Sequence, residues 1–332
     1  MKTKLFTLLL AIVASIGTMF AWDYNHLKIG DLYYNLNKAD NTAQVTSQSF
    51  SIPRWIDAIT DADIPTSVTH NSVPYDVTSV EKVAFEDCLT LTSVIIPNSV
   101  RSIGESAFRG CTALTYIKIG YLVDTIKHAT FYECTGLTSI NIPVSIDCIE
   151  SQAFAHCSSA TSVNTGNGVK SIGDYAFQQC TSMTSLTIGN SVTSIGKYAF
   201  YKCYGLTSIT IPKSVKSIGS YAFKDCTGLT SITCKSINPP SLGMGIFNGV
   251  DNTIPLFVPD QSVEAYKAAD GWNYFKDNTY PISSTAIHQT TIDQSQTTNR
   301  KLIIDGQLFI QRGDELFNAS GARVECPVSR HR

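Results

Sequence analysis

Phenylalanine recurs every 23 residues along this chain, and a cysteine follows three positions after each of these phenylalanines. The two columns are Phe85, Phe108, Phe131, Phe154, Phe177, Phe200 and Phe223, and Cys88, Cys111, Cys134, Cys157, Cys180, Cys203 and Cys226. A fixed internal period of about 20–50 residues is the signature of a solenoid, in which each unit stacks on its neighbours. The 332 residues are therefore expected to form one repeat array rather than two ordinary domains.

The clearest repeat runs from Leu206 to Cys226, with the sequence LTSITIPKSVKSIGSYAFKDC. Apolar and hydroxyl side chains alternate at its start, which predicts a short half-buried strand that Pro212 ends. Gly219 is expected to permit a tight turn. The Tyr-Ala-Phe that follows predicts a short helical or 3-10 segment that directs Phe223 inward. The repeat thus predicts a mostly β solenoid with about seven inward side chains per unit, which only stacking can bury.

The cysteine column would place seven of the ten cysteines one strand spacing apart, about 4.8 Å. A disulfide can span that separation. However, seven is an odd number, and neighbours that point the same way into a core rarely offer the required torsion. Free cysteine behaves as a small buried hydrophobe, so the sequence favours a buried thiol ladder over disulfides or metal binding. Cys148, Cys234 and Cys326 fall outside the column.

The N-terminal end departs from the repeat. Residues 1–21 combine Lys2 and Lys4 with an apolar run and are predicted to be a signal peptide. A retained signal anchor is the alternative, although the run is short for a span of about 20 apolar residues. Residues 22–63 are rich in strand-forming side chains and are expected to be an N-terminal β cap, because a solenoid must cover its terminal rungs.

Residues 64–282 hold the repeats and a closing cap, beginning with a small hairpin at Asn71-Ser72. Residues 283–299 are polar and nearly uncharged, which predicts a flexible linker. Residues 300–332 predict a small β unit of three short strands separated by Asp-Gly and Gly-Asp turns.

The pattern Leu-x-x-Ile-x-Ile-Pro-x-x-Val-x-x-Ile-Gly-x-x-Ala-Phe-x-x-Cys resembles the leucine-rich repeat of the BspA-like surface proteins over residues 64–282. Two departures are local. Thr130 replaces the usual Ala, and residues 158–166 lose the Leu and the Pro, so that repeat is expected to be the least regular. Residues 301–324 resemble the C-terminal sorting tail of proteins exported by the type IX system. The final CPVSRHR differs from the usual ending, and a β appendage without sorting function is the alternative.

Composition and motifs argue against several classes of function. The net charge of −2 gives no basic field for nucleic acid. The chain has no CxxC, HExxH, GxSxG or phosphate-binding loop. His156 adjoins Cys157, but that cysteine belongs to the column expected to be buried, whereas a nucleophilic pair needs an exposed thiolate. We therefore expect a protein that is not an enzyme and that has no metal or cofactor.

The outward strand positions carry mostly Ser, Thr and Asn, and the exceptions are Tyr116 and Lys118, with Ile95 one repeat earlier. A second outward column contains tyrosine at the position before the Ala-Phe pair. Tyrosine favours interfaces because it offers apolar area and a polar tip. Packing of the tyrosine column onto its own turn is the alternative. The predicted protein-binding residues are Tyr116, Lys118, Tyr175, Tyr198 and Tyr221.

The family resemblance implies a secreted or cell-surface protein that binds extracellular matrix proteins such as fibronectin and fibrinogen. A solenoid adds an extended rigid surface suited to protein partners. We therefore expect an adhesin-like solenoid that contacts host extracellular or community proteins. A structural or spacer protein of the envelope without a specific ligand is one alternative, and a glycan-binding or hydrolytic module is another.

Overall fold

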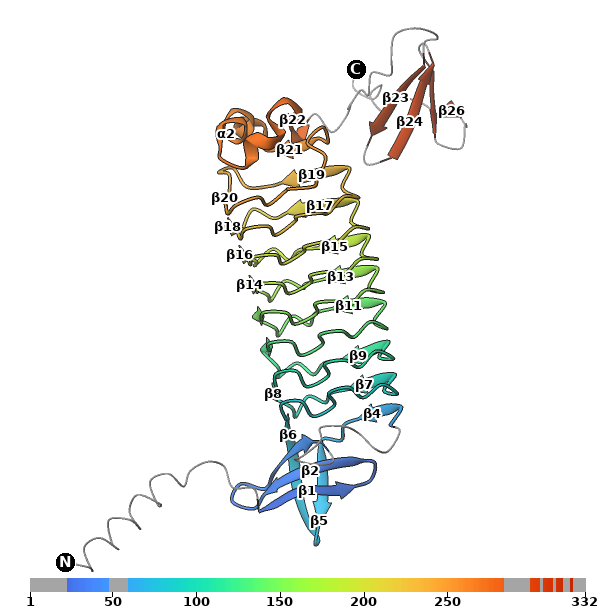
Figure 1. The fold of residues 1–332 in the computed structure, drawn as a ribbon, viewed down its shortest axis with the longest axis vertical. Coiled ribbons are helices and arrows are strands. Elements are labelled where there is room, and N and C mark those ends of the chain that lie inside the picture. The colour runs from blue at the N-terminus through green and yellow to red at the C-terminus, as the bar shows by residue number, and fades with distance from the viewer. Residues whose placement is uncertain are drawn as a thin grey trace, which may run out of the picture.

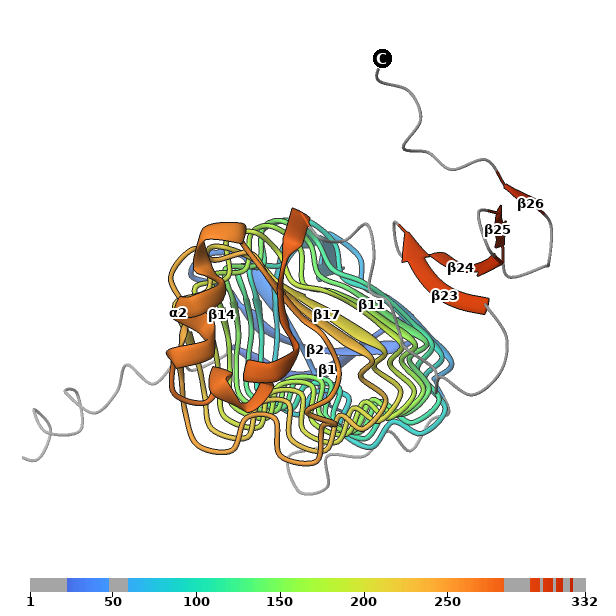
Figure 2. The ribbon, with the colours of Figure 1, turned by 90° about the horizontal axis from the view of Figure 1, so that it is seen from above.

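The computed structural model describes residues 23–47 and 59–283, together with four strands between residues 299 and 324. The predicted signal peptide and nearly all of the predicted linker lie outside the described residues. Residues 59–283 form a tall stack of similar turns, or rungs, with the chain climbing one rung in each repeat (Figure 1). Figure 2, seen along the stack, shows the rungs superimposed around a common interior. The predicted 23-residue solenoid is confirmed.

Each rung contributes one strand to a first parallel ladder, whose outward side we call the strand face. Its strands are β4 (Asp61–Asp63), β7 (Ser93–Ile95), β9 (Tyr116–Lys118), β11 (Ser139–Asn141), β13 (Ser162–Asn164), β15 (Ser185–Thr187), β17 (Ser208–Ile211), β19 (Ser231–Cys234), β21 (Leu256–Val258) and β22 (Thr279–Pro281). Within the described residues this ladder comprises three successive sheets, with interruptions between β9 and β11 and between β15 and β17. From β7 to β9, β11 to β15 and β17 to β19, paired residues lie 23 positions apart, as Ile140 and Val163 do.

A second parallel ladder runs along another side of the stack. Its strands are β8 (Ser102–Ile103), β10 (Thr125–Ile126), β12 (Cys148–Ile149), β14 (Ser171–Ile172), β16 (Ser194–Ile195), β18 (Ser217–Ile218) and β20 (Ser241–Leu242). The segments between this ladder and the next first-ladder strand are tight turns rather than the short helices expected from the sequence. Left-handed residues such as Tyr221 (φ 61°) and Asp225 (φ 58°) separate the successive i to i−3 hydrogen bonds, so no helix propagates.

The phenylalanine column forms the centre of the core. All seven rings are fully buried, and neighbouring rings stack with centroids 5.0–5.5 Å apart and planes within 2–10° of parallel. Burying one such side chain contributes about 1.5–3 kcal/mol. Phe247 extends the column after a 24-residue step and covers Phe223 at 6.0 Å. The stacked core predicted from the repeat is confirmed.

The cysteine column is a buried ladder of free thiols, as the sequence predicts. In six successive rungs the thiol donates a hydrogen bond to a phenylalanine carbonyl oxygen 26 residues earlier, at 3.1–3.4 Å. Burial raises the pKa of five of these thiols, those of Cys111, Cys134, Cys157, Cys180 and Cys203, and brings that of Cys180 to about 12. They are therefore protonated at neutral pH, as a hydrogen-bond donor must be.

The prediction that residues 158–166 form the least regular repeat is wrong. β13 pairs in register with both β11 and β15. Ala160 fills the position of the missing Leu without exposure, and the buried Thr165 hydroxyl accepts the N–H of Gly189 at 3.0 Å. Irregularity lies instead at β9, beside a break in the first ladder, where Ile117 and Ile119 are only half-buried.

Several glycines are required by close approach between rungs rather than by turn conformation. Gly219, which the sequence assigned to a tight turn, does not need a left-handed backbone. A Cβ atom there would lie 2.5 Å from the backbone nitrogen of Lys197 in the preceding rung. Because only glycine lacks a Cβ, it lets the two backbones pack together at this corner.

The N-terminal end is covered by a β sheet in the order β1, β2, β3, β6, β5. Its strands are β1 (Tyr24–Ile29), β2 (Leu32–Asn37), β3 (Thr42–Thr46), β5 (Ser67–His70) and β6 (Val73–Val80). The hairpin between β5 and β6 turns at Asn71 and Ser72, both left-handed, as the sequence predicts. β6 also pairs with β8, whereas β10 to β20 form a separate sheet, so the second ladder is interrupted between β8 and β10.

The C-terminal end of the stack is closed by short helices: η1 (Asp260–Ser262), α2 (Val263–Ala268) and η2 (Trp272–Asn278). The rings of Trp272 and Phe275 lie 5.7 and 5.1 Å from that of Phe247 and cover the last phenylalanine of the column. Beyond the stack, an antiparallel sheet contains one strand more than the three expected. Its strands are β23 (Asn299–Ile304), β24 (Gln307–Arg312), β25 (Glu315–Asn318) and β26 (Arg323–Val324).

Candidate protein-binding surfaces

The strand face carries two outward columns of short polar side chains. From β11 to β19 these positions contain only serine, threonine and asparagine. Tyr116 and Lys118 occupy the same two positions in β9, and Ile95 pairs with Lys118 across the ladder. The structure therefore places Tyr116 and Lys118 together on one exposed surface, as the sequence predicts.

A threonine precedes each strand of the first ladder from β4 to β19, and this column is a feature that sequence reasoning missed. In five rungs its hydroxyl donates to the backbone oxygen of the threonine 23 residues earlier, at 3.0–3.4 Å. The donor is used internally, so a partner has only the methyl group and the oxygen lone pairs to contact. The recurrence of Leu-Thr in successive repeats was the available signal, and it marks a structural ladder.

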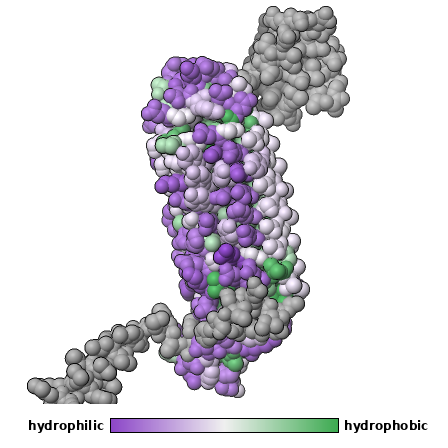
Figure 3. Space-filling model, in the orientation of Figure 1, coloured by the Kyte–Doolittle hydropathy of each residue, from purple (hydrophilic) through white to green (hydrophobic). Residues whose placement is uncertain are grey.

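Larger apolar side chains gather around the Tyr116 rung. The side chain of Tyr116 is 53% exposed, and those of Tyr121 and Val144, beyond the ends of their strands in consecutive rungs, are 64% and 75% exposed. In Figure 3 hydrophobic (green) surface lies near both ends of the stack, whereas the rungs between them are mostly hydrophilic. An exposed cluster of this composition on a polar face is typical of an interaction site.

The tyrosine column forms a second surface. Tyr175, Tyr198 and Tyr221 are half-buried, and their rings stack on one another at 5.0 and 4.9 Å. The rings therefore pack mainly on each other, rung upon rung. All three residues have a left-handed backbone (φ 60°, 55° and 61°), a conformation that favours glycine over tyrosine.

Two lysines complete this second surface. The ring of Tyr201 meets that of Tyr198 edge-on at 5.4 Å. The ammonium groups of Lys202 and Lys224 lie 5.1 and 5.6 Å from the centre of the Tyr201 ring, and Lys224 is also 5.6 Å from Tyr221. We call Tyr175, Tyr198, Tyr201, Tyr221, Lys202 and Lys224 the Tyr–Lys face. It continues upward to Met244, whose sulfur accepts the Tyr221 hydroxyl at 3.2 Å.

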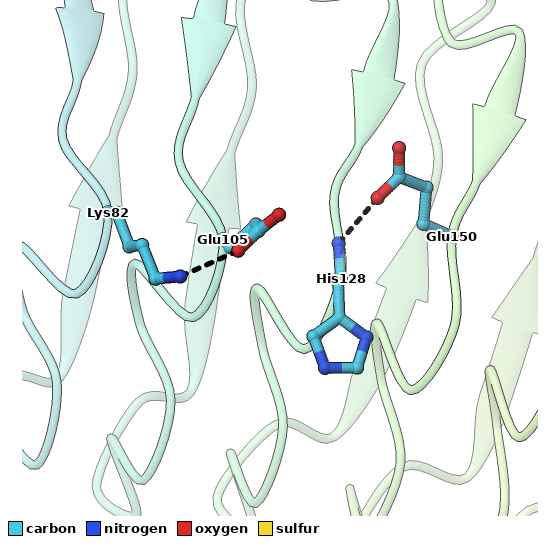
Figure 4. A network of polar contacts seen from close by, with 4 residues as sticks. All are labelled: Lys82, Glu105, His128 and Glu150. Atoms are coloured by element: carbon cyan, nitrogen blue, oxygen red, sulfur yellow. Dashed lines mark hydrogen bonds and ion pairs between the residues drawn. The ribbon is translucent and has the colours of Figure 1, made fainter.

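Charged side chains elsewhere pair across rungs. Lys82 contacts Glu105 at 2.8 Å, and in Figure 4 the next acidic group, Glu150, accepts the backbone N–H of His128. The hydrogen bond with Glu105 raises the pKa of Lys82, and the same contact lowers that of Glu105. Equivalent pairs join residues 86 and 109 and residues 147 and 170. Because these pairs are solvent-exposed, water screens them and they add little to stability.

The surface offers little support for catalysis. The Cys157 thiol is completely buried, and burial raises its pKa far above the ordinary value. The neighbouring His156 instead lies against Tyr132, with ring centres 5.2 Å apart. Among the described residues, no group of three or more His, Cys, Asp or Glu side chains could hold a metal ion. In the same part of the chain, no helix is both long and apolar enough to cross a bilayer.

A shallow polar groove crosses the rungs near His156. Its lining is Thr112, Glu133, Thr135, His156, Ser158, Gln179 and Thr181. Sugar-binding sites commonly place an aromatic ring face against the apolar face of a sugar, and this lining contains no Phe, Tyr or Trp. The groove therefore gives no specific support to the glycan-binding alternative.

Comparison with known proteins shows which proteins share this architecture. The BspA type leucine rich repeat region matches the chain in 6 copies, over residues 64–181, 148–279 and 193–309. A leucine rich cell surface protein from Faecalibacterium prausnitzii A2-165 is 30% identical, with 71% of each chain covered and a TM-score of 0.53.

Two further solved structures are less similar. A leucine-rich repeat protein from Bacteroides ovatus ATCC 8483 is 26% identical, with 70% of each chain covered and a TM-score of 0.40. The T. pallidum leucine rich repeat protein is 25% identical, covering 68% of this chain and 89% of its own, with a TM-score of 0.46. No curated protein sequence matches the chain. On the repeats and the family match together, this chain belongs to the BspA-type leucine-rich repeat family.

Proposed function

We propose that this chain is an exported cell-surface protein that binds extracellular proteins through the strand face around Tyr116 and Lys118. The observation that carries the proposal is the exposed Tyr116 on a strand face otherwise built from short polar residues, with exposed Tyr121 and Val144 just beyond the strands of the same rung and the next. Aromatic side chains supply much of the binding energy at protein interfaces because they bury a large area at low entropic cost. Lys118 adds a charge that can select an acidic partner.

The family context supports the same class of function. The relative from F. prausnitzii is described as a cell surface protein. The thiols are buried and so are unsuited to nucleophilic catalysis. The extended, rigid surface of a solenoid is instead suited to binding other proteins. Host matrix proteins such as fibronectin and fibrinogen are the partners to test first.

A structural or spacer role is the second candidate. The threonine ladder favours it, because the hydroxyl donors of that column bond within the stack rather than to a partner. A spacer would hold other surface components at a distance without a ligand of its own.

The decisive experiment is capture of fibronectin and fibrinogen by the full mature chain immobilised on beads. The Tyr116→Ala/Lys118→Ala variant is compared with Ser208→Ala/Thr210→Ala, which alters the same two strand positions four rungs away. We expect the first variant to reduce capture at least tenfold and the second to leave it unchanged, since a buried aromatic anchor is worth about 2 kcal/mol or more.

Each other outcome has a definite meaning. Absence of capture by the unaltered chain would exclude binding to these proteins and favour the spacer role. Equal capture by both variants would place the binding surface elsewhere on the stack. Release of products from a glycan or peptide panel by the pure protein would overturn the proposal that it is not an enzyme.

The ends of the chain have proposed roles as well. Residues 1–21 would direct export, residues 22–63 would cap the stack of residues 64–282, and residues 283–299 would link the stack to the small sheet. Residues 300–332 would act as the sorting tail. The four antiparallel strands within this tail form a unit separate from the parallel ladders.

A further inference from the structure

The charges of the solenoid are divided along its axis. Residues 59–164 contain eleven acidic and five basic residues, whereas residues 165–236 contain seven lysines and two aspartates. The chain as a whole has a net charge of −2 and conceals this division. The Tyr–Lys face lies in the basic half.

The lysines of this face are held differently from those of the acidic half. Lys82 and Arg109 contact carboxylates of adjacent rungs, whereas Lys202 and Lys224 lie against the ring of Tyr201. A cation over an aromatic face keeps its charge and its hydrogen-bond donors. The carboxylate of Asp225 acts on Lys202 and offsets part of this charge. Asp174 accepts the N–H of Lys197 at 2.7 Å.

The tyrosine stack decides how a partner can approach. The faces of Tyr198 are covered by Tyr175 and Tyr221, so that no sugar ring can stack on it. Ring planes that stack along the axis direct their edges outward, and the edge of an aromatic ring carries positive potential. Ring edges, phenol groups and ammonium groups together therefore favour carboxylates.

We propose that the Tyr–Lys face is a second docking surface, and that it binds acidic segments of partner proteins. Charge complementarity selects the carboxylate-rich chain, and the occupied ring faces argue against a glycan. Tyr175, Tyr198 and Tyr221 have a left-handed backbone, a conformation that does not favour tyrosine. Backbone geometry therefore does not explain the tyrosines at these positions, and a binding role does. This proposal and the proposed function both name a protein as the partner. They are otherwise independent, because the Tyr–Lys face and the strand face lie on different sides of the rungs.

The test measures binding of fluorescent poly-L-glutamate to the full mature chain at low salt. The Lys202→Gln/Lys224→Gln variant removes two charges from the Tyr–Lys face. The matched control, Lys213→Gln/Lys235→Gln, removes two charges just beyond the ends of β17 and β19. We expect an affinity loss of about tenfold in the first variant and of less than about threefold in the control, with the difference vanishing near 0.5 M salt.

Two further variants distinguish loss of binding at the Tyr–Lys face from loss of folding and from loss of binding at the Tyr116 site. Tyr198→Phe keeps the ring stack and should weaken binding about threefold, with an unchanged melting temperature. Tyr116→Ala/Lys118→Ala should bind poly-L-glutamate normally, even if it no longer captures matrix proteins. Equal losses of affinity in the two lysine variants would show that poly-L-glutamate responds only to the overall positive charge, and would overturn the proposal. Absence of poly-L-glutamate binding, or preference for polygalacturonate, would also overturn it.

Discussion

The thiol of Cys157 donates a hydrogen bond to the backbone oxygen of Phe131, 3.3 Å away and one rung earlier. The same oxygen also accepts the N–H of Cys134 within its own turn. Each rung is therefore joined to the preceding one by a side chain as well as by its strands. This bond explains why the column holds cysteine and not merely a small apolar residue.

Replacing Cys157 by valine tests the contribution of this bond, because valine fills a similar volume without a donor. We expect the free energy of unfolding to fall by about 0.5–1.5 kcal/mol, since the Phe131 oxygen keeps one partner. Denaturant titration provides the measurement. Cys148→Val, at a half-buried position outside the column, is the control and should change stability less.

The thiol column also predicts alkaline instability. An unfolded cysteine loses its proton near pH 9.0, whereas burial raises the pKa of Cys180 to about 12. Above pH 9 the unfolded state thus binds fewer protons than the folded state, and stability falls as the pH rises toward 12. Each such thiol lowers the free energy of unfolding by about 1.4 kcal/mol per pH unit in this window.

Denaturation midpoints measured from pH 7 to 10.5 provide the check. They should be nearly flat up to the ordinary thiol pKa of 9.0 and then decline. Cys180→Val should decline less steeply because one titrating group is gone. A pH-independent midpoint throughout would show that the thiols do not control this behaviour.

The central phenylalanines are expected to be the most sensitive core positions. Phe177→Ala removes a fully buried ring stacked at 5.5 and 5.4 Å against Phe154 and Phe200. The loss should be about 3–5 kcal/mol, because a cavity remains between two rigid rungs. Calorimetry or denaturant titration will show it, with Phe177→Leu expected to cost less. A loss below about 1 kcal/mol would mean that the stack repacks around the gap.

Glycine at the rung corners should be equally intolerant of change. In Gly219→Ala the new Cβ would lie 2.5 Å from the nitrogen of Lys197, so one backbone must shift. We expect about 1–3 kcal/mol of destabilisation. Gly205→Ala, whose nearest neighbours are 3.0 Å away, should cost less. A reversed order of the two melting temperatures would contradict the close-approach explanation.

The proposed sorting role of residues 300–332 predicts that their deletion blocks display at the cell surface without unfolding the stack. Protease accessibility on intact cells measures display, and thermal melting of the purified protein measures folding. Surface display of the truncated chain would refute the role of the tail. Loss of folding together with display would show that the tail is structural.

The periodic part of this architecture follows from the sequence because each repeat position has one dominant physical role. Phe, Cys and the apolar strand residues recur at fixed spacing, and the same environment recurs with them. Residues 158–166 form a more regular repeat than their sequence predicts, because Ala160 and Thr165 replace the expected residues without changing the path of the chain. The role of Gly219 was misassigned because contacts between rungs cannot be seen within one repeat.

The candidate surfaces were only partly predictable. The alternation of strand residues placed Tyr116 and Lys118 outward, and the structure agrees. The joining of Tyr201, Lys202 and Lys224 into one face depends on how successive turns overlie each other, which a linear pattern does not specify. The internal hydrogen bonds of the threonine column likewise require the spatial distance between rungs.

The uniform register between rungs has an evolutionary consequence. Strand partners in the regular rungs lie 23 positions apart, and both ends of the stack are closed by their own dedicated elements. Gain or loss of a whole unit by recombination would therefore leave every junction matched and change only the height of the protein. The length of the stack becomes a quantity that gene rearrangement can adjust in steps of one rung.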